Sequence, residues 1–190
     1  MSSADSWQIL FWSSFAALAC TFLGYPLLIG VLAKIAPRPP AKSRPAHPPS
    51  VSVVLVAFNE EARIRARVEN LLAADYPAGQ LEVLVVTDGS TDGTVAQLRA
   101  LAHPRVRVLA REQRSGKSAC LNAAIPAARG EIVVLCDARQ RFAPHTIPEL
   151  VANFSDPALG AVSGALEIDP AATGVGGGVD LYWRLEKFIR

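Results

Sequence analysis

The chain has 190 residues, of which 51% are hydrophobic, and its 19 Lys and Arg against 17 Asp and Glu give a formal net charge of +2. This length suits one domain with an appendage. The positive balance comes from four basic residues at positions 34–49, because positions 50–190 carry 15 basic and 16 acidic residues. The charge is therefore no indication of nucleic-acid binding.

The first expected element is an apolar run from Ile9 to Ala33. These 25 residues contain no charge and, as a helix, are long enough to cross a hydrocarbon core about 30 Å thick. A signal peptide fits less well, because the first eight residues hold no Lys or Arg and the run is too long. We predict a membrane anchor over residues 1–33, with a tolerated kink at Gly24 and Pro26.

A basic, proline-rich linker is expected over residues 34–49. Six prolines between Pro37 and Ser50, without hydrophobic periodicity, predict a semi-extended segment. Asp5 is the only charge before the apolar run, and the four basic residues of the linker follow it, so the positive-inside rule places the C-terminal side in the cytoplasm. The same basic residues can contact anionic membrane lipid.

Strands and helices then alternate, which predicts an α/β domain over residues 50–190 with a largely parallel sheet and right-handed crossovers. The expected strands are Val51–Ala57, Glu82–Thr87, Arg105–Ala110 and Glu131–Cys136. The expected helices are one capped by Asn59 with a stripe of Ile64, Val68, Leu71 and Leu72, one from Thr91 or Asp92 to Ala102, and one from Gly116 to Ala128 capped by Ser115.

The pattern loosens after Asp137. We expect a helix near Ile147–Phe154, a strand near Gly160–Leu166, a flexible stretch over Ala171–Gly178 and an amphipathic helix from Val179. The three cysteines and three histidines show neither a disulfide framework nor the spacing of metal ligands, and we assign them no functional role.

Polar residues stand at the ends of three of the expected strands. Phe58-Asn59-Glu60-Glu61 follows the first, Asp88-Gly-Ser-Thr-Asp-Gly-Thr94 follows the second, and Asp137 ends the fourth. Ligands of open α/β sheets bind outside the carboxyl ends of the strands, so these residues are expected to converge on one binding site. The alternative for residues 88–94 is a plain loop in which Asp92 caps the next helix.

Gly116-Lys117-Ser118 suggests a phosphate-binding P-loop. The first glycine of that motif is missing, because position 111 is Arg. A hydrophobic strand that ends in Asp137 imitates the second motif of the P-loop proteins, so a P-loop-like NTPase is a minor alternative. The N-terminus of the helix expected from Gly116 would favour negative charge.

The order of these motifs resembles the N-terminal half of family 2 glycosyltransferases, which use a GT-A fold to bind a nucleotide-diphosphate sugar. The resemblance covers roughly Ser50 to Leu166 and includes the segment Gly116-Lys117-Ser118 with Leu121-Asn122. It implies a Rossmann-like, mostly parallel sheet with flanking helices behind one transmembrane helix. It also implies transfer of a sugar, with inversion by in-line displacement, to a glycan or lipid-linked acceptor on the cytoplasmic side of the membrane.

The resemblance also implies roles for single residues. Asp88 matches the aspartate that accepts a hydrogen bond from the nucleotide base, the aromatic at Phe58 lies by that base, and Lys117 lies near the diphosphate. The expected nucleotide-sugar site consists of Val56, Ala57, Phe58, Glu60, Asp88, Gly89, Lys117, Asp137 and Arg139.

The segment Asp137-Ala138-Arg139 departs from the family pattern. Family members usually carry Asp-x-Asp here, and the two carboxylates hold a divalent cation that bridges the phosphates. Arg139 replaces the second carboxylate, which weakens an Mg²⁺ or Mn²⁺ site at Asp137 and puts metal dependence in question. A guanidinium can itself clamp a diphosphate. The alternative is that Arg139 faces solvent or pairs with Glu149.

Two features of the family have no match up to Arg190: a carboxylate general base and an acceptor-binding Gln/Arg/Trp segment. Glu167, Asp169 and Asp180 are carboxylates outside any matching motif, so no catalytic base is assigned, and we expect it beyond Arg190. Because the chain stops inside a predicted helix, we expect a catalytic domain truncated at its C-terminus. An inactive or binding-only nucleotide-sugar fragment is the alternative.

Overall fold

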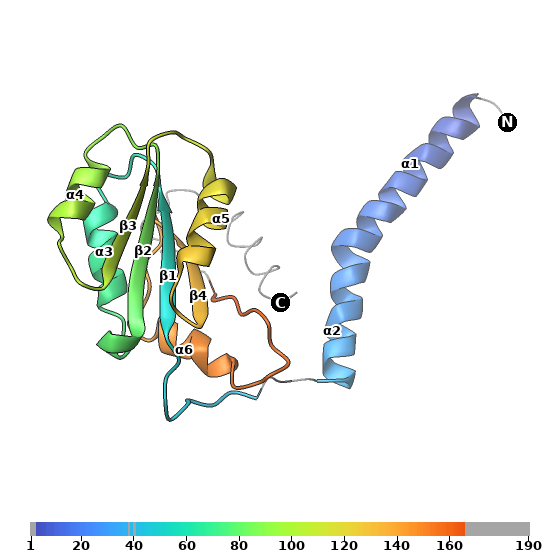
Figure 1. Cartoon of the computed structure of the whole chain (residues 1–190). Helices are drawn as coiled ribbons and strands as arrows, with labels where there is room; N and C mark the ends of the chain where they lie inside the picture. The colour runs from blue at the N-terminus through green and yellow to red at the C-terminus, as the bar shows by residue number, and fades with distance from the viewer. Residues whose placement is uncertain (1–2, 38, 40, 166–190) are drawn as a thin grey trace. The chain divides into compact units, whose positions relative to one another are not determined.

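The computed structural model describes residues 3–37, 39 and 41–165. They belong to two units, an N-terminal helical unit and an α/β unit of residues 40–164, drawn together in Figure 1. The stretch expected over Ala171–Gly178 and the helix expected from Val179 lie outside the described residues, as do Glu167, Asp169 and Asp180.

The helical unit consists of α1 (Ser3–Ala19), a π-helical turn (Cys20–Gly24) and α2 (Tyr25–Ile35). The backbone N–H of Tyr25 donates to the carbonyl oxygen of Cys20, five residues earlier. Pro26 follows at the start of α2 and has no N–H to donate, and a wider turn gives its ring room against the preceding carbonyls. The irregularity predicted at Gly24 and Pro26 is therefore a π turn within a continuous helix.

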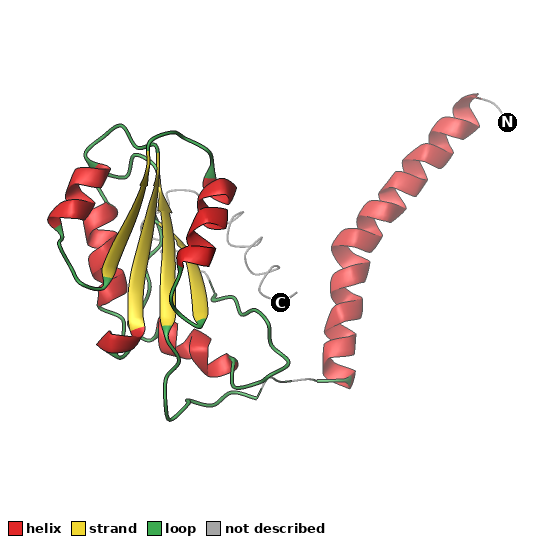
Figure 2. Cartoon of the chain, in the orientation of Figure 1, coloured by secondary structure: helices red, strands yellow, loops and turns green. Residues whose placement is uncertain are grey.

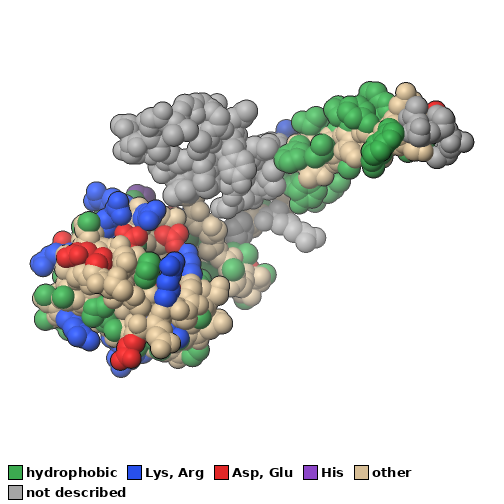
Figure 3. All heavy atoms as spheres, turned by 90° about the horizontal axis from the view of Figure 1, so that it is seen from above, with side chains coloured by type: hydrophobic (Ala, Val, Ile, Leu, Met, Phe, Trp, Pro, Cys, Tyr) green, Lys and Arg blue, Asp and Glu red, His purple; other side chains and the backbone are tan. Residues whose placement is uncertain are grey.

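The helical run Asp5–Ile35 has 31 residues and is long and apolar enough to cross a membrane. Its large apolar side chains, from Trp7 to Ile35, are exposed, and Figure 3 shows hydrophobic side chains along its surface. A helix that is hydrophobic all round normally lies in an apolar environment. The structure thus agrees with the predicted apolar helix, while its direction through a membrane stays a prediction.

The α/β unit contains a four-stranded parallel sheet, in the order β3-β2-β1-β4. The α/β class with a parallel sheet is confirmed. The strands are β1 (Val51–Ala57), β2 (Leu81–Asp88), β3 (Val106–Arg111) and β4 (Ile132–Asp137), and a 3-10 turn (Ala78–Gln80) precedes β2. The helices are α3 (Ile64–Leu72), α4 (Thr94–Ala100), α5 (Lys117–Ala127) and α6 (Thr146–Asn153).

The sheet is covered on both faces, as the continuous apolar runs of β1 and β2 require. On one face, α3 and α4 pack with α6 over alternate strand residues such as Leu55 and Val85. On the other face, α5 packs through Cys120 and Ala124 over the intervening residues, among them Leu84. Figure 1 shows α3 and α4 on one side of the strands and α5 on the other.

The register aligns the carboxyl ends of the strands. Ala57 pairs with Thr87, Val56 pairs with Asp137, and Asp88 pairs with Arg111. All four arrows in Figure 2 point the same way, so the loops that follow β1, β2, β3 and β4 leave the sheet at one edge. The polar residues predicted to converge therefore do share an edge.

Two predicted caps are wrong. Asn59 adopts a left-handed conformation with φ of 52° in a turn, and α3 begins only at Ile64. The side chain of Asn59 instead bonds a neighbouring loop. The residue that precedes α5 is Gly116, and Ser115 directs its hydroxyl to Asp88. In both cases a partner distant in sequence competes successfully with the local helix terminus.

The predicted strand near Gly160 is also wrong for its described part. Residues 160–165 form no strand. This segment is rich in Gly, Ala and Ser, which pack poorly in a sheet, and a strand needs a hydrogen-bonded neighbour to persist.

The end of the linker is bound to α6. Lys42 and Arg44 both form ion pairs with Glu149, and the backbone N–H of Ser43 donates to Ser155 Oγ at 3.0 Å. The hydroxyl of Ser155 in turn donates to the carbonyl of Ala41 at 2.8 Å. Two of the four basic residues predicted to contact lipid are thus paired with protein, and lipid contact stays a prediction.

Candidate functional site

The loops that follow β1 and β2 are joined by hydrogen bonds. The backbone N–H of Asn59 donates to Ser90 Oγ at 3.2 Å, and that of Thr91 donates to Asn59 Oδ1 at 2.9 Å. Farther along, the N–H of Glu60 donates to Thr94 Oγ1 at 2.9 Å. These bonds hold the two loops in one arrangement at the carboxyl edge of the sheet.

Asp92 serves both loops. One of its carboxylate oxygens accepts from the N–H of Glu61 at 3.1 Å, and the other accepts from the N–H of Thr94 at 3.0 Å. The second bond satisfies a donor at the first residue of α4, although the residue that precedes this helix is Gly93 and not the predicted Asp92. Both bonds stabilise the charged carboxylate, and the hydrogen bonds from Thr94 are the main cause that lowers the pKa of Asp92.

Asp88 is buried, with an exposed fraction of 4%, and its carboxylate binds the loop between β3 and α5. It accepts hydrogen bonds from the backbone N–H of Ser115 at 2.6 Å, from the hydroxyl of Ser115 at 3.1 Å and from the N–H of Gly116 at 2.9 Å. The bond from the Ser115 N–H is the largest cause that lowers the pKa of Asp88, although burial opposes it. A carboxylate has about four acceptor positions, and the thiol of Cys120 interacts with Asp88 in addition to these three bonds, so the positions are used.

Gly89 allows this loop to come close. Its φ is +67°, and a Cβ atom at this position would lie 2.6 Å from the backbone nitrogen of Arg114. Only a residue without a side chain accepts both the left-handed backbone and that contact. Gly89 therefore has a structural role in the site, and a ligand contact of its backbone stays a prediction.

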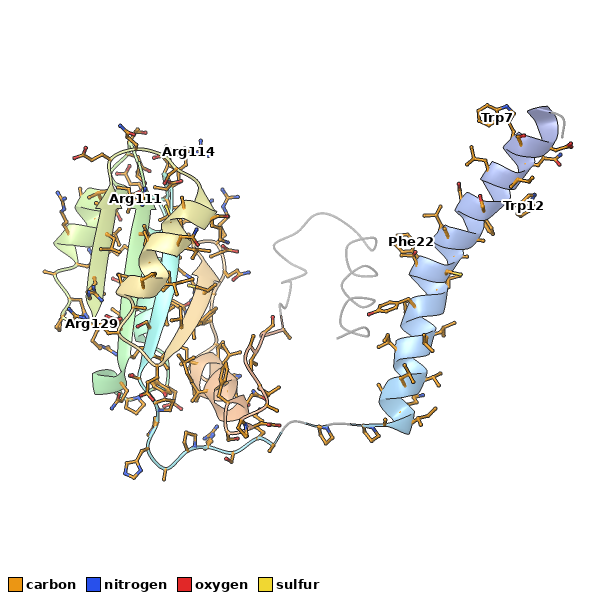
Figure 4. The ribbon with its side chains drawn as sticks, turned by 45° about the vertical axis from the view of Figure 1, so that its right-hand side comes forward. Trp7, Trp12, Phe22, Arg111, Arg114 and Arg129 are labelled. Atoms are coloured by element: carbon orange, nitrogen blue, oxygen red, sulfur yellow. The ribbon has the colours of Figure 1, made fainter. Side chains whose placement is uncertain are left out.

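The ring of Phe58 packs against the guanidinium of Arg114. The guanidinium carbon of Arg114 lies 4.2 Å from the ring centroid, close enough for a cation–π interaction. Figure 4 places Arg114 and Arg111 at the same end of the α/β unit and Arg129 at the opposite end. Arg114 was not among the predicted site residues, although its place in the loop after β3 could have indicated this edge of the sheet.

The backbone of Val56 and Ala57 takes part in the sheet. Val56 pairs with β2 on one side and with β4 on the other, and Ala57 pairs with Thr87. The predicted contact between this backbone and a nucleoside stays a prediction.

Two neighbouring ion pairs occupy the part of the edge near the end of β4. Lys117 Nζ lies 2.5 Å from Asp137 Oδ1, and Arg139 Nε lies 3.4 Å from Glu60 Oε1. The other carboxylate oxygen of Glu60, Oε2, lies 3.2 Å from Arg63 Nη1. Of the two alternatives for Arg139, a pair with Glu149 is wrong, because Glu149 binds Lys42 and Arg44. In Figure 3, basic and acidic side chains lie next to one another on this face.

A buried arginine fixes the turn that carries Arg139. Arg67 has an exposed fraction of 3%, and its Nε donates to the carbonyl of Asp137 at 3.1 Å. Its guanidinium also lies 4.6 Å from the ring centroid of Phe142 and donates to Asn70 Oδ1 at 2.7 Å. Asn70 accepts from the N–H of Phe142 and donates to its carbonyl. Sequence reasoning missed Arg67, because nothing local distinguishes it from the solvent-facing positions of α3.

The residues at this edge do not by themselves build a site for a divalent cation. Among the described residues there is no group of three His, Cys, Asp or Glu that could hold a metal ion. The nearest carboxylates, Asp137 and Glu60, are each paired with a basic side chain. A hard cation prefers six or more oxygen ligands, so most of them would have to come from elsewhere.

With this geometry in hand, comparisons with known proteins identify the family. The sequence pattern of "Glycosyl transferase family 2" matches residues 52–188, and the chain belongs to this family. It is similar to a beta-monoglucosyldiacylglycerol synthase of Nostoc sp., with 36% identity over 160 residues that cover 82% of this chain and 34% of that protein. A dolichol-phosphate mannosyltransferase of Saccharomyces cerevisiae is 32% identical over 112 residues, covering 57% of this chain and 42% of that protein.

Among solved structures, the chain is similar to a mannosyltransferase from Pyrobaculum calidifontis in complex with GDP-Man and Mn²⁺. The identity is 36%, the TM-score is 0.66, and the match covers 76% of this chain and 44% of that one. This likeness confirms the predicted GT-A-type fold. The chain thus spans less than half the length of these three relatives.

The carboxylate of Asp88 can be tested by Asp88→Asn. The amide nitrogen cannot accept from the N–H groups, so we expect the free energy of unfolding at pH 7 to fall by about 1.5–3 kcal/mol. Because the folded pKa of Asp88 is lowered, its stabilisation is present above the unfolded pKa and is lost as the pH falls through the folded pKa. The difference in melting temperature from the wild type should therefore shrink in acid.

The matched control is Asp75→Asn, at an exposed aspartate away from this edge, for which we expect no change. Equal melting temperatures of the wild type and Asp88→Asn at pH 7, or a difference that does not vary with pH, would contradict the assigned role.

Proposed function

We propose that this chain contains the nucleotide-sugar-binding part of a membrane-anchored glycosyltransferase. The proposed organisation is an anchor over residues 1–33, a linker over 34–49 and a nucleotide-sugar-binding domain over 50–190. The observation that carries the proposal is the cluster of Lys117 and Arg139 at the carboxyl edge of the sheet, in a region that matches a glycosyltransferase family. Two cations at the carboxyl ends of parallel strands favour a diphosphate ligand.

The nucleoside is proposed to bind between the loops after β1 and β3. The ring of Phe58 offers a flat apolar face, and Arg114 can stack on a base as it stacks on the ring in the unliganded chain. A bond from a donor on the base to Asp88 would replace the weak bond from the Cys120 thiol, because the donors of Ser115 and Gly116 use the other acceptor positions. The fixed loop around Ser115 and Gly116 supports binding without a large rearrangement.

The proposed reaction is a single in-line displacement at the anomeric carbon, with inversion. The bond from the sugar to the diphosphate breaks as the acceptor oxygen attacks, and negative charge develops on the departing nucleotide diphosphate. Lys117 and Arg139 would stabilise that charge electrostatically. The acceptor hydroxyl loses its proton to a general base, to which we assign no described residue.

Relatives support the substrate class. The relative from Nostoc sp. is named as a synthase of a glucosyldiacylglycerol, and the structure from Pyrobaculum calidifontis holds GDP-Man. By analogy, we propose a nucleotide-diphosphate sugar as donor and a glycan or lipid-linked acceptor for this chain. An acceptor at the membrane would agree with an apolar helix of 31 residues on the same chain.

Binding of the diphosphate can be tested with Lys117→Ala. Lys117 is exposed, so its removal should leave the fold intact while one charged contact to phosphate is lost. We expect the dissociation constant of UDP or GDP, whichever the wild type binds, to rise about tenfold or more in calorimetry. The matched control is Lys42→Ala, which removes a lysine paired with Glu149 and should not change binding.

Unchanged nucleotide binding by Lys117→Ala would contradict the proposed diphosphate site. In parallel, transfer of a radiolabelled sugar by the 190-residue chain would exclude the binding-only alternative, whereas binding without transfer would favour it.

The proposed orientation places residues from Ser50 onward in the cytoplasm. It follows from the basic residues that come after the apolar helix, with only Asp5 before it. A reporter enzyme that is active only outside the cytoplasm, fused after Ser50, should be silent, and a reporter that is active only in the cytoplasm should give signal. The opposite pair of results would overturn the orientation.

A further inference from the structure

We infer that the diphosphate subsite uses the guanidinium of Arg139 in place of a divalent cation, so that nucleotide diphosphates bind to this chain without metal. The inference rests on the proposed function, because it concerns the same subsite. It is carried by the charge balance of the cluster, by the way Glu60 holds Arg139, and by the turn that Arg67 fixes.

The ion-paired side chains around Arg139 carry more positive than negative charge. Two carboxylates, Asp137 and Glu60, face three basic side chains, Lys117, Arg139 and Arg63. A divalent cation at Asp137 would have to displace Lys117 and would lie among like charges, which is unfavourable at these distances. A phosphate group would instead be attracted, because these five ion-paired side chains hold three positive and two negative charges.

The guanidinium of Arg139 is bound through Nε, while its two terminal nitrogens remain available to a ligand. Its Nε lies 3.4 Å from Glu60 Oε1, while 78% of its side chain is exposed. Glu60 is itself buried, and its backbone is fixed by the bond from its N–H to Thr94 Oγ1. Within the described part of the chain, the ion pair engages only Nε, which leaves the two terminal nitrogens to donate to phosphate oxygens in the bidentate manner typical of arginine.

The backbone under Arg139 is fixed from inside the domain. Arg67 donates to the carbonyl of Asp137, and Asn70 bonds both the N–H and the carbonyl of Phe142, so the turn between them is held at both ends. A buried arginine is costly unless it is paired. Here Arg67 bonds this turn and Asn70 and stacks on Phe142, while its Nη2 has no hydrogen-bond partner among the described residues. A turn held in this way orders Arg139 before the ligand arrives, which lowers the entropic cost of binding.

A guanidinium and a metal ion are not equivalent. Arg139 supplies a permanent charge and directed donors, whereas a metal ion adds Lewis acidity and binds ligands through its own coordination sphere. Replacing Arg139 by Asp would recreate the carboxylate pair with Asp137 that such an ion requires. The substitution should therefore convert a metal-free subsite into a metal-dependent one.

The experiment is calorimetry of UDP and GDP on the full chain in detergent, with a chelator or with Mn²⁺. For the wild type, we expect dissociation constants that agree within about twofold in the two conditions. For Arg139→Asp, we expect binding weaker by about tenfold or more with chelator, and a large part of this loss should be recovered with Mn²⁺. Binding of Mn²⁺ can be followed by the paramagnetic resonance signal of the free ion, against a sample that holds the same nucleotide without protein, because nucleotide diphosphates bind Mn²⁺ themselves. A loss of free-ion signal beyond that sample should appear with this variant and not with the wild type.

Two further variants serve as controls. Arg139→Lys keeps the charge without the planar fork and should bind more weakly than the wild type, yet equally with and without Mn²⁺. Arg129→Asp makes the same charge reversal at the opposite end of β4 and should behave as the wild type, as its position in Figure 4 indicates.

The outcomes separate this inference from the proposed function. If the wild type binds nucleotide only with Mn²⁺, the inference is overturned and the proposed function stands. If Arg139→Asp binds as the wild type does in both conditions, Arg139 does not contact phosphate and the inference is again overturned. An absence of nucleotide binding under every condition would overturn both.

Discussion

The buried carboxylate of Asp88 is the contact on which the geometry of the site depends. It stands at the end of β2 and accepts two backbone N–H bonds and one hydroxyl bond from Ser115 and Gly116, which come just before α5. This holds α5 so that Lys117 reaches Asp137, and it holds the adjacent Arg114 over Phe58. Three strand ends are thereby joined into one surface, with Gly89 leaving space for the loop.

The polar residues of this edge are bonded mainly to one another, and this shapes what they can do. Loops that are bound together do not need to be ordered by a ligand, so the binding surface is formed in advance. The acceptors Asp88 and Asp92 are largely used by backbone donors, whereas the basic side chains of Lys117 and Arg139 remain exposed. An edge with occupied acceptors and accessible cations favours an anionic ligand such as a diphosphate.

The sequence predicts the sheet well, because long apolar runs such as Val51–Ala57 determine strands almost to the residue. It predicts local polar geometry poorly. Asn59 and Ser115 are residue types that commonly cap helices, yet each bonds a residue about thirty positions away. A local sequence pattern does not predict such distant partners. The pairs between Phe58 and Arg114 and between Glu60 and Arg139 depend in the same way on the order of the strands.

The central claim is that a nucleotide diphosphate binds at the carboxyl edge of the sheet, against the loops that follow β1, β3 and β4. Hydrogen–deuterium exchange of the full chain, with and without saturating UDP or GDP, tests it most directly. The account predicts slower exchange in peptides that cover residues 56–61, 113–118 and 137–142, and unchanged exchange in α6. Protection confined to α6 or to other parts of the chain, with none at these three loops, would contradict it.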